Sequence, residues 1–289
     1  MEIRYEDLTI QNDFMFKKVM QSKRICKRLV SEIIQAPIRD IVYLETEKTI
    51  DAYIDSKGIR LDVLIADEQN THYNIEMQVR DILGQYKKEQ VLPKRTRYYQ
   101  SIIDTDMLQK GQDYDDLPPL FLIFICAFDL FKQDRYIYEF KNRCSEDYEL
   151  VLNNEVTVMF LNSVGKQGKV SPLVKNFLQY VNDHVPKDEF TREIENEVVR
   201  LKHDKKVRRE FMVLSTRLKD ERMIGRAEGR EEGREEGRAE GKKETTTAIV
   251  KNMLKNGVAL EIIEQCTNLS LEEILEIANE ENLKISTNP

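Results

Sequence analysis

Tryptophan is absent from this 289-residue chain, and histidine and cysteine are scarce, with three and four copies. The cysteines lie far apart, with no CxxC pair and no histidine cluster near them. That spacing supports neither a zinc site nor a disulfide framework, because both need clustered ligands or partners. We therefore expect reduced thiols, as in a cytoplasmic protein. The four cysteines are Cys26, Cys126, Cys144 and Cys266.

Long apolar runs are also missing. The longest, LFLIFICAF (120–128), is about half the roughly 20 residues that a membrane-spanning helix needs. The first residues, MEIRYEDLTIQNDF, show no basic segment followed by an apolar stretch, so we expect no secretory signal. The net charge of -7 argues against a basic coat over the whole surface. These features predict a cytoplasmic protein with no membrane partner.

What the chain does contain is an ordered series of helix and strand patterns. Apolar residues at helical spacing predict a helix over 12–34, with Asn12 or Asp13 as its cap. A second helix is predicted over 84–109, kinked or entered at Pro93. Strands are predicted at 41–50, 60–66, 73–79, 120–131, 135–140 and 156–161. The order of helix, three strands, helix and strand predicts an α/β sandwich around a mixed sheet.

Two carboxylates interrupt the predicted hairpin LDVLIADEQNTHYNIEMQV (61–79). A turn centred on Gln69 would place Asp62 directly opposite Glu76, with Cβ atoms about 5 Å apart. Gln78 would share the strand face of Glu76, because side chains alternate between the two faces. The other face would be purely apolar. Its residues would be Leu61, Val63, Ile65, Ile75, Met77 and Val79.

A pair of facing carboxylates has two interpretations. Two converging acidic oxygens suit a hard divalent cation such as Mg²⁺, which uses one or two carboxylates and keeps several waters. Alternatively, each carboxylate pairs with a basic side chain and performs no chemistry. The candidate basic partners are Arg60, Lys87 and Arg95.

Several stretches, taken in order, resemble the recombination-promoting nuclease and transposase family of the PD-(D/E)XK nuclease superfamily. The resemblance extends from residue 10 to about residue 245 and includes the tail repeat. It implies a restriction-endonuclease-like αβββαβ core with a mixed sheet, followed by a helical C-terminal region. The stretches are NDFMFKKVM (12–20), LDVLIADEQNTHYNIEMQVR (61–80), KRTRYYQSII (94–103), KGQDYDDLPP (110–119) and LFLIFICAFDLF (120–131).

The resemblance also implies a chemistry, the hydrolysis of DNA phosphodiester bonds with Mg²⁺ or Mn²⁺. Asp62 and Glu76 would be both catalytic residues and metal ligands, and Asp13 would approach the metal from the first helix. Gln78 occupies the place where the wider superfamily has lysine. Glutamine brings no positive charge, so its expected role is to orient the attacking water through hydrogen bonds.

Basic residues on the two predicted helices would neutralise DNA phosphates. The alternative is that they are solvated helix faces. On the second helix these residues are Lys87, Lys88, Lys94, Arg95 and Arg97, and on the first they are Lys17 and Lys18.

Three functions remain open from the sequence. The first is a magnesium-dependent DNA endonuclease linked to recombination or transposition of mobile elements. The second is a non-catalytic DNA-binding or assembly protein that retains the nuclease fold. The third is a nuclease held inactive until its C-terminal segment finds a partner.

The C-terminal part of the chain has a different character. The stretch GRAEGREEGREEGRAEGKKE (225–244) has glycine at every fourth position. Five glycines cost a helix about 1 kcal/mol each relative to alanine. We therefore favour a solvated flexible spacer over a helix whose glycine stripe packs against a partner.

Residues 247–282 regain helical periodicity and predict three short helices. Ser270 and Glu273 have the spacing of a capping box. Many glutamates in this region would repel phosphates, which favours protein contact or homo-oligomerisation over DNA binding. Three segments are therefore predicted. They are a nuclease-like domain at 1–185, a charged helical segment with the Gly-x-x-Glu repeats at 186–244, and a small helical module at 245–289.

Overall fold

The computed structural model describes residues 4–50, 58–79 and 88–280 of the chain. The chain divides into two compact units, Met1–Phe211 and Met212–Pro289. None of the helices in the described ranges combines the length and the apolar character that a membrane span requires.

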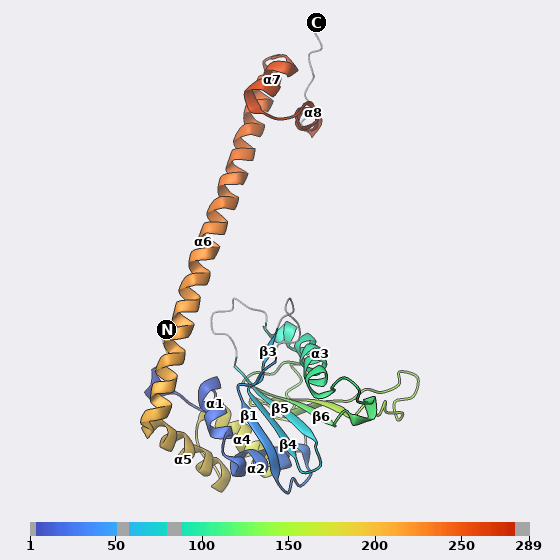
Figure 1. Cartoon of the computed structure of the whole chain (residues 1–289), viewed down its shortest axis with the longest axis vertical. Helices are drawn as coiled ribbons and strands as arrows, with labels where there is room; N and C mark the ends of the chain where they lie inside the picture. The colour runs from blue at the N-terminus through green and yellow to red at the C-terminus, as the bar shows by residue number, and fades with distance from the viewer. Residues whose placement is uncertain (1–3, 51–57, 80–87, 281–289) are drawn as a thin grey trace. The chain divides into compact units, whose positions relative to one another are not determined.

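A six-stranded mixed sheet forms the centre of the first unit (Figure 1). The strands β5, β6 and β8 are parallel neighbours, while β1, β4 and β7 run antiparallel to the strands beside them. This confirms the predicted α/β class with a mixed sheet. In spatial order the strands are β1 (Ile41–Thr46), β4 (Val63–Asp67), β5 (His72–Gln78), β6 (Leu120–Cys126), β8 (Val156–Asn162) and β7 (Ile137–Phe140). A separate two-stranded sheet pairs β2 (Thr49–Ile50) with β3 (Ile59–Arg60).

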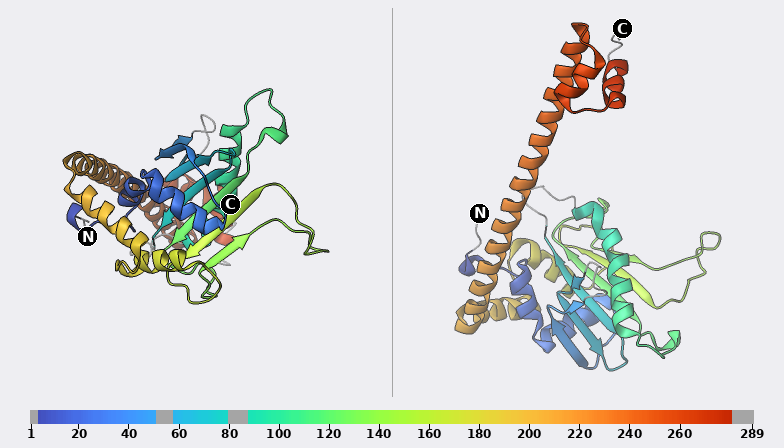
Figure 2. Two further views of the ribbon diagram at one scale, coloured as in Figure 1. Left: turned by 90° about the horizontal axis from the view of Figure 1, so that it is seen from below. Right: turned by 45° about the horizontal axis from the view of Figure 1, so that its top comes forward.

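Helices cover both faces of the large sheet (Figures 1 and 2). The helix α3 (Lys88–Met107) lies on one face, where its Leu92, Ile102 and Ile103 join a buried cluster with Leu122 and Phe124 of β6. The remaining helices of this unit form the layer on the other face. They are α1 (Asp13–Met20), α2 (Lys23–Ile34), α4 (Pro172–Asp183) and α5 (Glu189–His203). Short 3-10 turns occur at Tyr5–Asp7 and Tyr114–Asp116.

The hairpin of β4 and β5 has the predicted register, and most of its predicted apolar face is buried. Val63 pairs with Ile75, which centres the turn as expected. However, every residue of β4 is buried, because Leu64 packs into the cluster under α3 while Val63 and Ile65 are buried on the other side. Val79 was expected in the core and is instead 40% exposed. The predicted apolar face is therefore confirmed at Val63, Ile65 and Ile75 and wrong at Val79, while the carboxylate face also contains the buried Leu64.

Two predicted elements are each divided in the structure. The helix expected over 12–34 breaks between α1 and α2, where Ser22 adopts an extended conformation. The cap prediction is confirmed, because the Asn12 side chain accepts hydrogen bonds from the backbone of Phe14 and Met15. The strand expected over 41–50 is interrupted at Glu47, whose φ of 64° is left-handed. The part of the second predicted helix before residue 88 lies outside the described residues.

The second unit is helical. The helix α6 (Lys205–Lys255) begins in the first unit, and it is followed by α7 (Leu260–Thr267) and α8 (Leu271–Glu280). The favoured flexible spacer is a wrong prediction, because the whole glycine repeat lies within α6. Three helical segments confirm the expectation for residues 247–282. Their apolar cluster consists of Val250, Leu254, Ile263, Ile274 and Ala278.

The ends of these helices follow local rules. Ser270 and Glu273 form the predicted capping box, with the Glu273 carboxylate accepting from the Ser270 N–H at 2.8 Å. Gly257, with a φ of 71°, follows the last residues of α6. Its N–H donates to the Leu254 carbonyl at 3.1 Å. Glycine suits this position because a left-handed helix end is strained for residues with a Cβ atom.

Candidate active site

The two hairpin carboxylates meet at one end of the pair β4 and β5. Asp62 directly precedes β4, and Glu76 lies in β5. The Asp62 N–H donates to Glu76 Oε1 at 3.0 Å, and the Met77 N–H donates to Asp62 Oδ2 at 3.0 Å. Each carboxylate is thus held by the backbone of the opposite strand, which fixes its orientation.

The remaining carboxylate oxygens face cations. Asp62 Oδ1 lies 3.2 Å from Nζ of Lys17, and Glu76 Oε2 lies 3.2 Å from Nη2 of Arg95. Each carboxylate therefore has an ion pair, as in the alternative interpretation. The partner of Glu76, Arg95, is one of the three expected from the sequence, and the partner of Asp62, Lys17, is not. Arg60 instead lies near Asp13, at 3.8 Å.

Burial makes ionisation of both carboxyl groups costly. The pKa of Asp62 is raised by desolvation, then by the nearby charges of Glu76 and Asp13, against the opposing effect of Lys17. The pKa of Glu76 is also raised by desolvation, although the Asp62 N–H and Arg95 act to lower it. Because the two carboxylates are buried close to each other, binding of a proton or of a cation is favoured there.

Gln78 belongs to the same constellation. Its Oε1 accepts a hydrogen bond from Arg95 Nη1 at 3.2 Å, and its Nε2 lies 3.5 Å from Glu76 Oε2. Arg95 is itself held against Tyr99, donating to the phenol oxygen at 2.7 Å with its guanidinium 4.8 Å from the ring centre. The pKa of Tyr99 is raised to about 12 by burial and by Glu76, so the phenol stays neutral. Arg95 therefore orients the Gln78 amide while remaining one-third exposed itself.

Lys17 was expected at the surface, in contact with phosphate, and that expectation is wrong. Its side chain is only 3% exposed, and its ammonium lies 2.8 Å from Asp13 and 3.6 Å from Glu47 as well as near Asp62. Burial acts to lower the pKa of Lys17, but Asp62 and Asp13 outweigh this effect and the pKa is raised. Lys17 therefore remains a cation inside the site.

Sequence reasoning missed two members of this cluster. Lys17 lies four residues after Asp13 and hence on the same helix face, which is a usable signal. Glu47 gives no comparable signal, since a left-handed backbone between β1 and β2 places it. Asp13 opens α1 and is half-exposed, as expected of a residue that approaches the site from the first helix.

The predicted DNA-binding residues have different surroundings. Lys94 and Arg97 are exposed on α3, on either side of Arg95. Lys18 is engaged by Glu210, with 2.6 Å between Nζ and Oε2. Lys87 lies outside the described residues, and so does the side chain of Lys88. Phosphate binding by these residues stays a prediction.

The donor set fits a hard divalent cation, which Asp62 and Glu76 would hold. Both offer carboxylate oxygens in a site where burial makes a compensating positive charge favourable. Among the described residues, no group of three His, Cys, Asp or Glu side chains has the arrangement of a metal site. The participation of Asp13 as a third ligand therefore stays a prediction.

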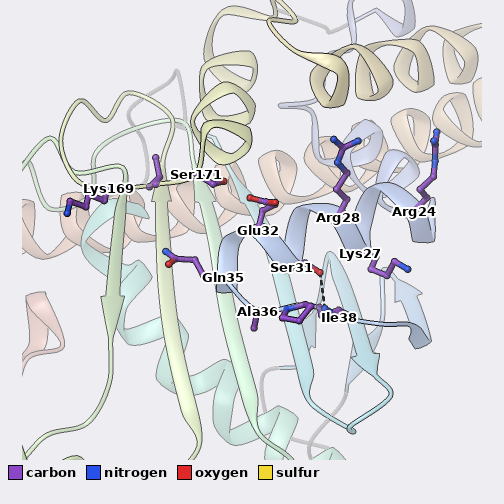
Figure 3. A pocket seen from close by; sticks show the side chains of 12 residues that line it. Arg24, Lys27, Arg28, Ser31, Glu32, Gln35, Ala36, Ile38, Lys169 and Ser171 are labelled. Atoms are coloured by element: carbon purple, nitrogen blue, oxygen red, sulfur yellow. Dashed lines mark hydrogen bonds between the residues drawn. The ribbon is translucent and has the colours of Figure 1, made fainter.

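A hollow of about 820 Å³ lies elsewhere, between α2 and the segment that leads into α4 (Figure 3). Three of its basic residues are already engaged. Arg24 pairs with Glu193 at 2.8 Å, Lys27 donates to the Arg39 carbonyl at 3.0 Å, and Arg28 lies over an aromatic ring. It shares no residue with the carboxylate site.

Comparison with known proteins agrees with this geometry. A family model described as a PD-(D/E)XK nuclease family transposase matches residues 10–179. The chain matches no curated protein and no solved structure. The matched segment includes the whole of the large sheet and all residues of the carboxylate constellation.

Proposed function

The chain belongs to the PD-(D/E)XK nuclease family of transposases, and from this we propose that it is a metal-dependent DNA endonuclease that acts in recombination or transposition. The observation that carries the proposal is the register of β4 and β5, which brings Asp62 beside Glu76: the Asp62 N–H donates to the Glu76 carboxylate, and the Met77 N–H donates to the Asp62 carboxylate. Two facing buried carboxylates are costly for a merely structural hairpin, because their charges repel, each must be desolvated, and a buried ion pair does not fully offset that cost.

Each residue has a definable task in this function. Asp62 and Glu76 would hold Mg²⁺ or Mn²⁺, which would supply Lewis-acid polarisation of the phosphoryl group and a lowered pKa of a bound water. Gln78, oriented by Arg95, donates a hydrogen bond that positions the attacking water. Arg95, whose side chain is one-third exposed, would place its positive charge near the phosphate, where charge accumulates during the reaction.

Further contacts to DNA would lie on α3. Lys94 and Arg97 are exposed on α3, three residues apart and hence on one face of the helix, and would neutralise backbone phosphates without reading sequence. Such contacts make binding dependent on salt, since each neutralised phosphate releases counterions.

Nicking of supercoiled plasmid tests the proposal. We expect cleavage with Mg²⁺ or Mn²⁺, none with EDTA, and loss of nearly all activity in Asp62→Asn and Glu76→Gln. Glu149→Gln is a matched control, because Glu149 is exposed and lies outside the site. Equal cleavage by wild type and both site variants would refute the assignment.

The competing function is a DNA-binding or assembly protein without catalysis. One observation favours it: Lys17 and Arg95 already compensate the two carboxylates. Retention of DNA binding in a mobility-shift assay, with no metal-dependent cleavage under any of these conditions, would establish this alternative.

A further inference from the structure

Lys17 is the buried cation of the candidate site. Its ammonium lies 3.2 Å from Asp62 Oδ1, and its side chain is 3% exposed. The other oxygen, Asp62 Oδ2, accepts the Met77 N–H. Within the described ranges, Lys17 thus lies against the oxygen of Asp62 that accepts no backbone hydrogen bond, and it is too deeply buried to contact a DNA phosphate.

Two further carboxylates lie around the same ammonium, nearer to solvent. Asp13 Oδ2 is 2.8 Å from Lys17 Nζ and Glu47 Oε1 is 3.6 Å from it, and these two side chains are 48% and 44% exposed. Glu47 is tied to the site by its own backbone, because its N–H donates to the Asp62 carbonyl at 3.1 Å. A lysine ammonium has three N–H donors, so it can serve all three carboxylates.

Lys17 and a divalent cation would compete for Asp62. Both are positive, and like charges a few ångströms apart repel strongly in a partly buried site. A cation bound at Asp62 would therefore drive the ammonium toward its other partners. Asp13 and Glu47 already lie within reach, so that shift needs no large rearrangement.

We propose that Lys17 is an exchangeable counter-ion and a positioning residue. It holds Asp62 in the metal-free protein and passes to Asp13 and Glu47 when a divalent cation binds at Asp62. Glu47 therefore strengthens metal binding without being a ligand, because it stabilises the displaced ammonium. This inference rests on the metal-dependent function proposed above.

A double-mutant cycle on the full-length chain tests the exchange. Mn²⁺ affinity is measured by titration calorimetry for wild type, Glu47→Gln, Lys17→Met and the double variant. We expect Glu47→Gln to weaken Mn²⁺ binding about threefold or more in the presence of Lys17, and to have no effect in Lys17→Met. Glu45→Gln is the matched control, because Glu45 is an exposed acid of the neighbouring strand that does not pair with Lys17. It should bind Mn²⁺ like wild type.

Several outcomes would overturn the exchange. An equal loss with and without Lys17 would mean that Glu47 acts on the cation directly, and no loss in the wild-type background would exclude any role for Glu47. If circular dichroism shows that Lys17→Met is unfolded, Lys17→Gln replaces it in the cycle. A wild-type protein that binds no Mn²⁺ would overturn the proposed metal site together with the exchange. If the wild-type protein binds Mn²⁺ and Glu47→Gln binds it equally well, the exchange is overturned and the proposed metal site is not.

Discussion

At the residue scale, Asp62 and Glu76 each accept one hydrogen bond from the backbone and each lie beside one cationic side chain. The pairing of Asp62 with Glu76 was predictable, because a turn position and the alternation of strand side chains determine which residues face each other. The role of Lys17 was not, because it depends on how α1 packs beside the sheet. The only signal in the sequence is that Lys17 lies four residues after Asp13 and hence on the same helix face. That signal is useful only once Asp13 is placed near the site.

Gln78 provides the first prediction. Gln78→Ala should lower single-turnover cleavage about 10²–10⁴-fold, the usual contribution of a positioned group. Its Mn²⁺ affinity should stay near wild type, because Glu76 keeps its contacts with Arg95 and the Asp62 N–H. Rapid-quench rates and calorimetric titration measure the two quantities. Loss of Mn²⁺ binding would make Gln78 a ligand, and an unchanged rate would make it a bystander.

The raised pKa values of Asp62 and Glu76 provide the second prediction, which concerns how stability depends on pH. A carboxyl group whose pKa is raised in the folded state binds more protons there than in the unfolded chain, so stability falls as pH rises above the ordinary carboxyl range. Metal-free wild type should therefore be less stable at about pH 8 than at about pH 5, and Asp62→Asn should show a smaller decrease. Urea denaturation in EDTA measures both, with Glu149→Gln as a variant that should follow wild type. Parallel curves for wild type and Asp62→Asn would contradict the assigned pKa direction.

At the element scale, the apolar patterns predicted which elements form but not where some of them break. The run at 120–131 is buried on both faces, as a central strand should be, and β6 confirms it over Leu120–Cys126. By contrast, the breaks at Ser22 and Glu47 are backbone turns within segments of unbroken apolar spacing. Such breaks are determined by packing against neighbouring elements, and the spacing of apolar residues in the sequence does not reveal that packing.

The glycine repeat of α6 provides the third prediction. A Cβ atom added at Gly229, Gly233 or Gly237 would meet no atom within 4 Å. Replacing all three by alanine should therefore stabilise the helix by about 1 kcal/mol per site. Circular dichroism should show more helix and a higher melting temperature, whereas Glu235→Ala should change little, since both residues are good helix formers.

The opposite result would be informative about the same element. Alanine substitutions that lower the melting temperature, or that reduce self-association in light scattering, would show that another helix packs closely against the glycines. The helix would then owe its stability to that contact.

At the scale of the whole molecule, the candidate active site lies entirely in the first unit, and α7 and α8 lie in the second. All members of the carboxylate constellation lie before residue 100, and Phe211 closes the first unit by packing against Tyr5 and Phe14, with ring centres 5.4 Å apart in both pairs. The second unit has its own apolar cluster. The predicted division at residues 185 and 244 stays a prediction, since it concerns how these segments behave separately.

A protein ending at Phe211 tests this separation and provides the last prediction. It should keep its fold, its Mn²⁺ affinity and its metal-dependent nicking, because it retains the sheet, α3 and the cluster around Lys17. It should lose whatever self-association the full chain shows, because the acidic helices that it lacks suit protein contacts better than phosphates. Light scattering, thermal melting and the plasmid assay measure these properties side by side. A truncated protein that melts like the full chain but neither binds nor nicks DNA would instead give the C-terminal helices a direct part in holding the substrate.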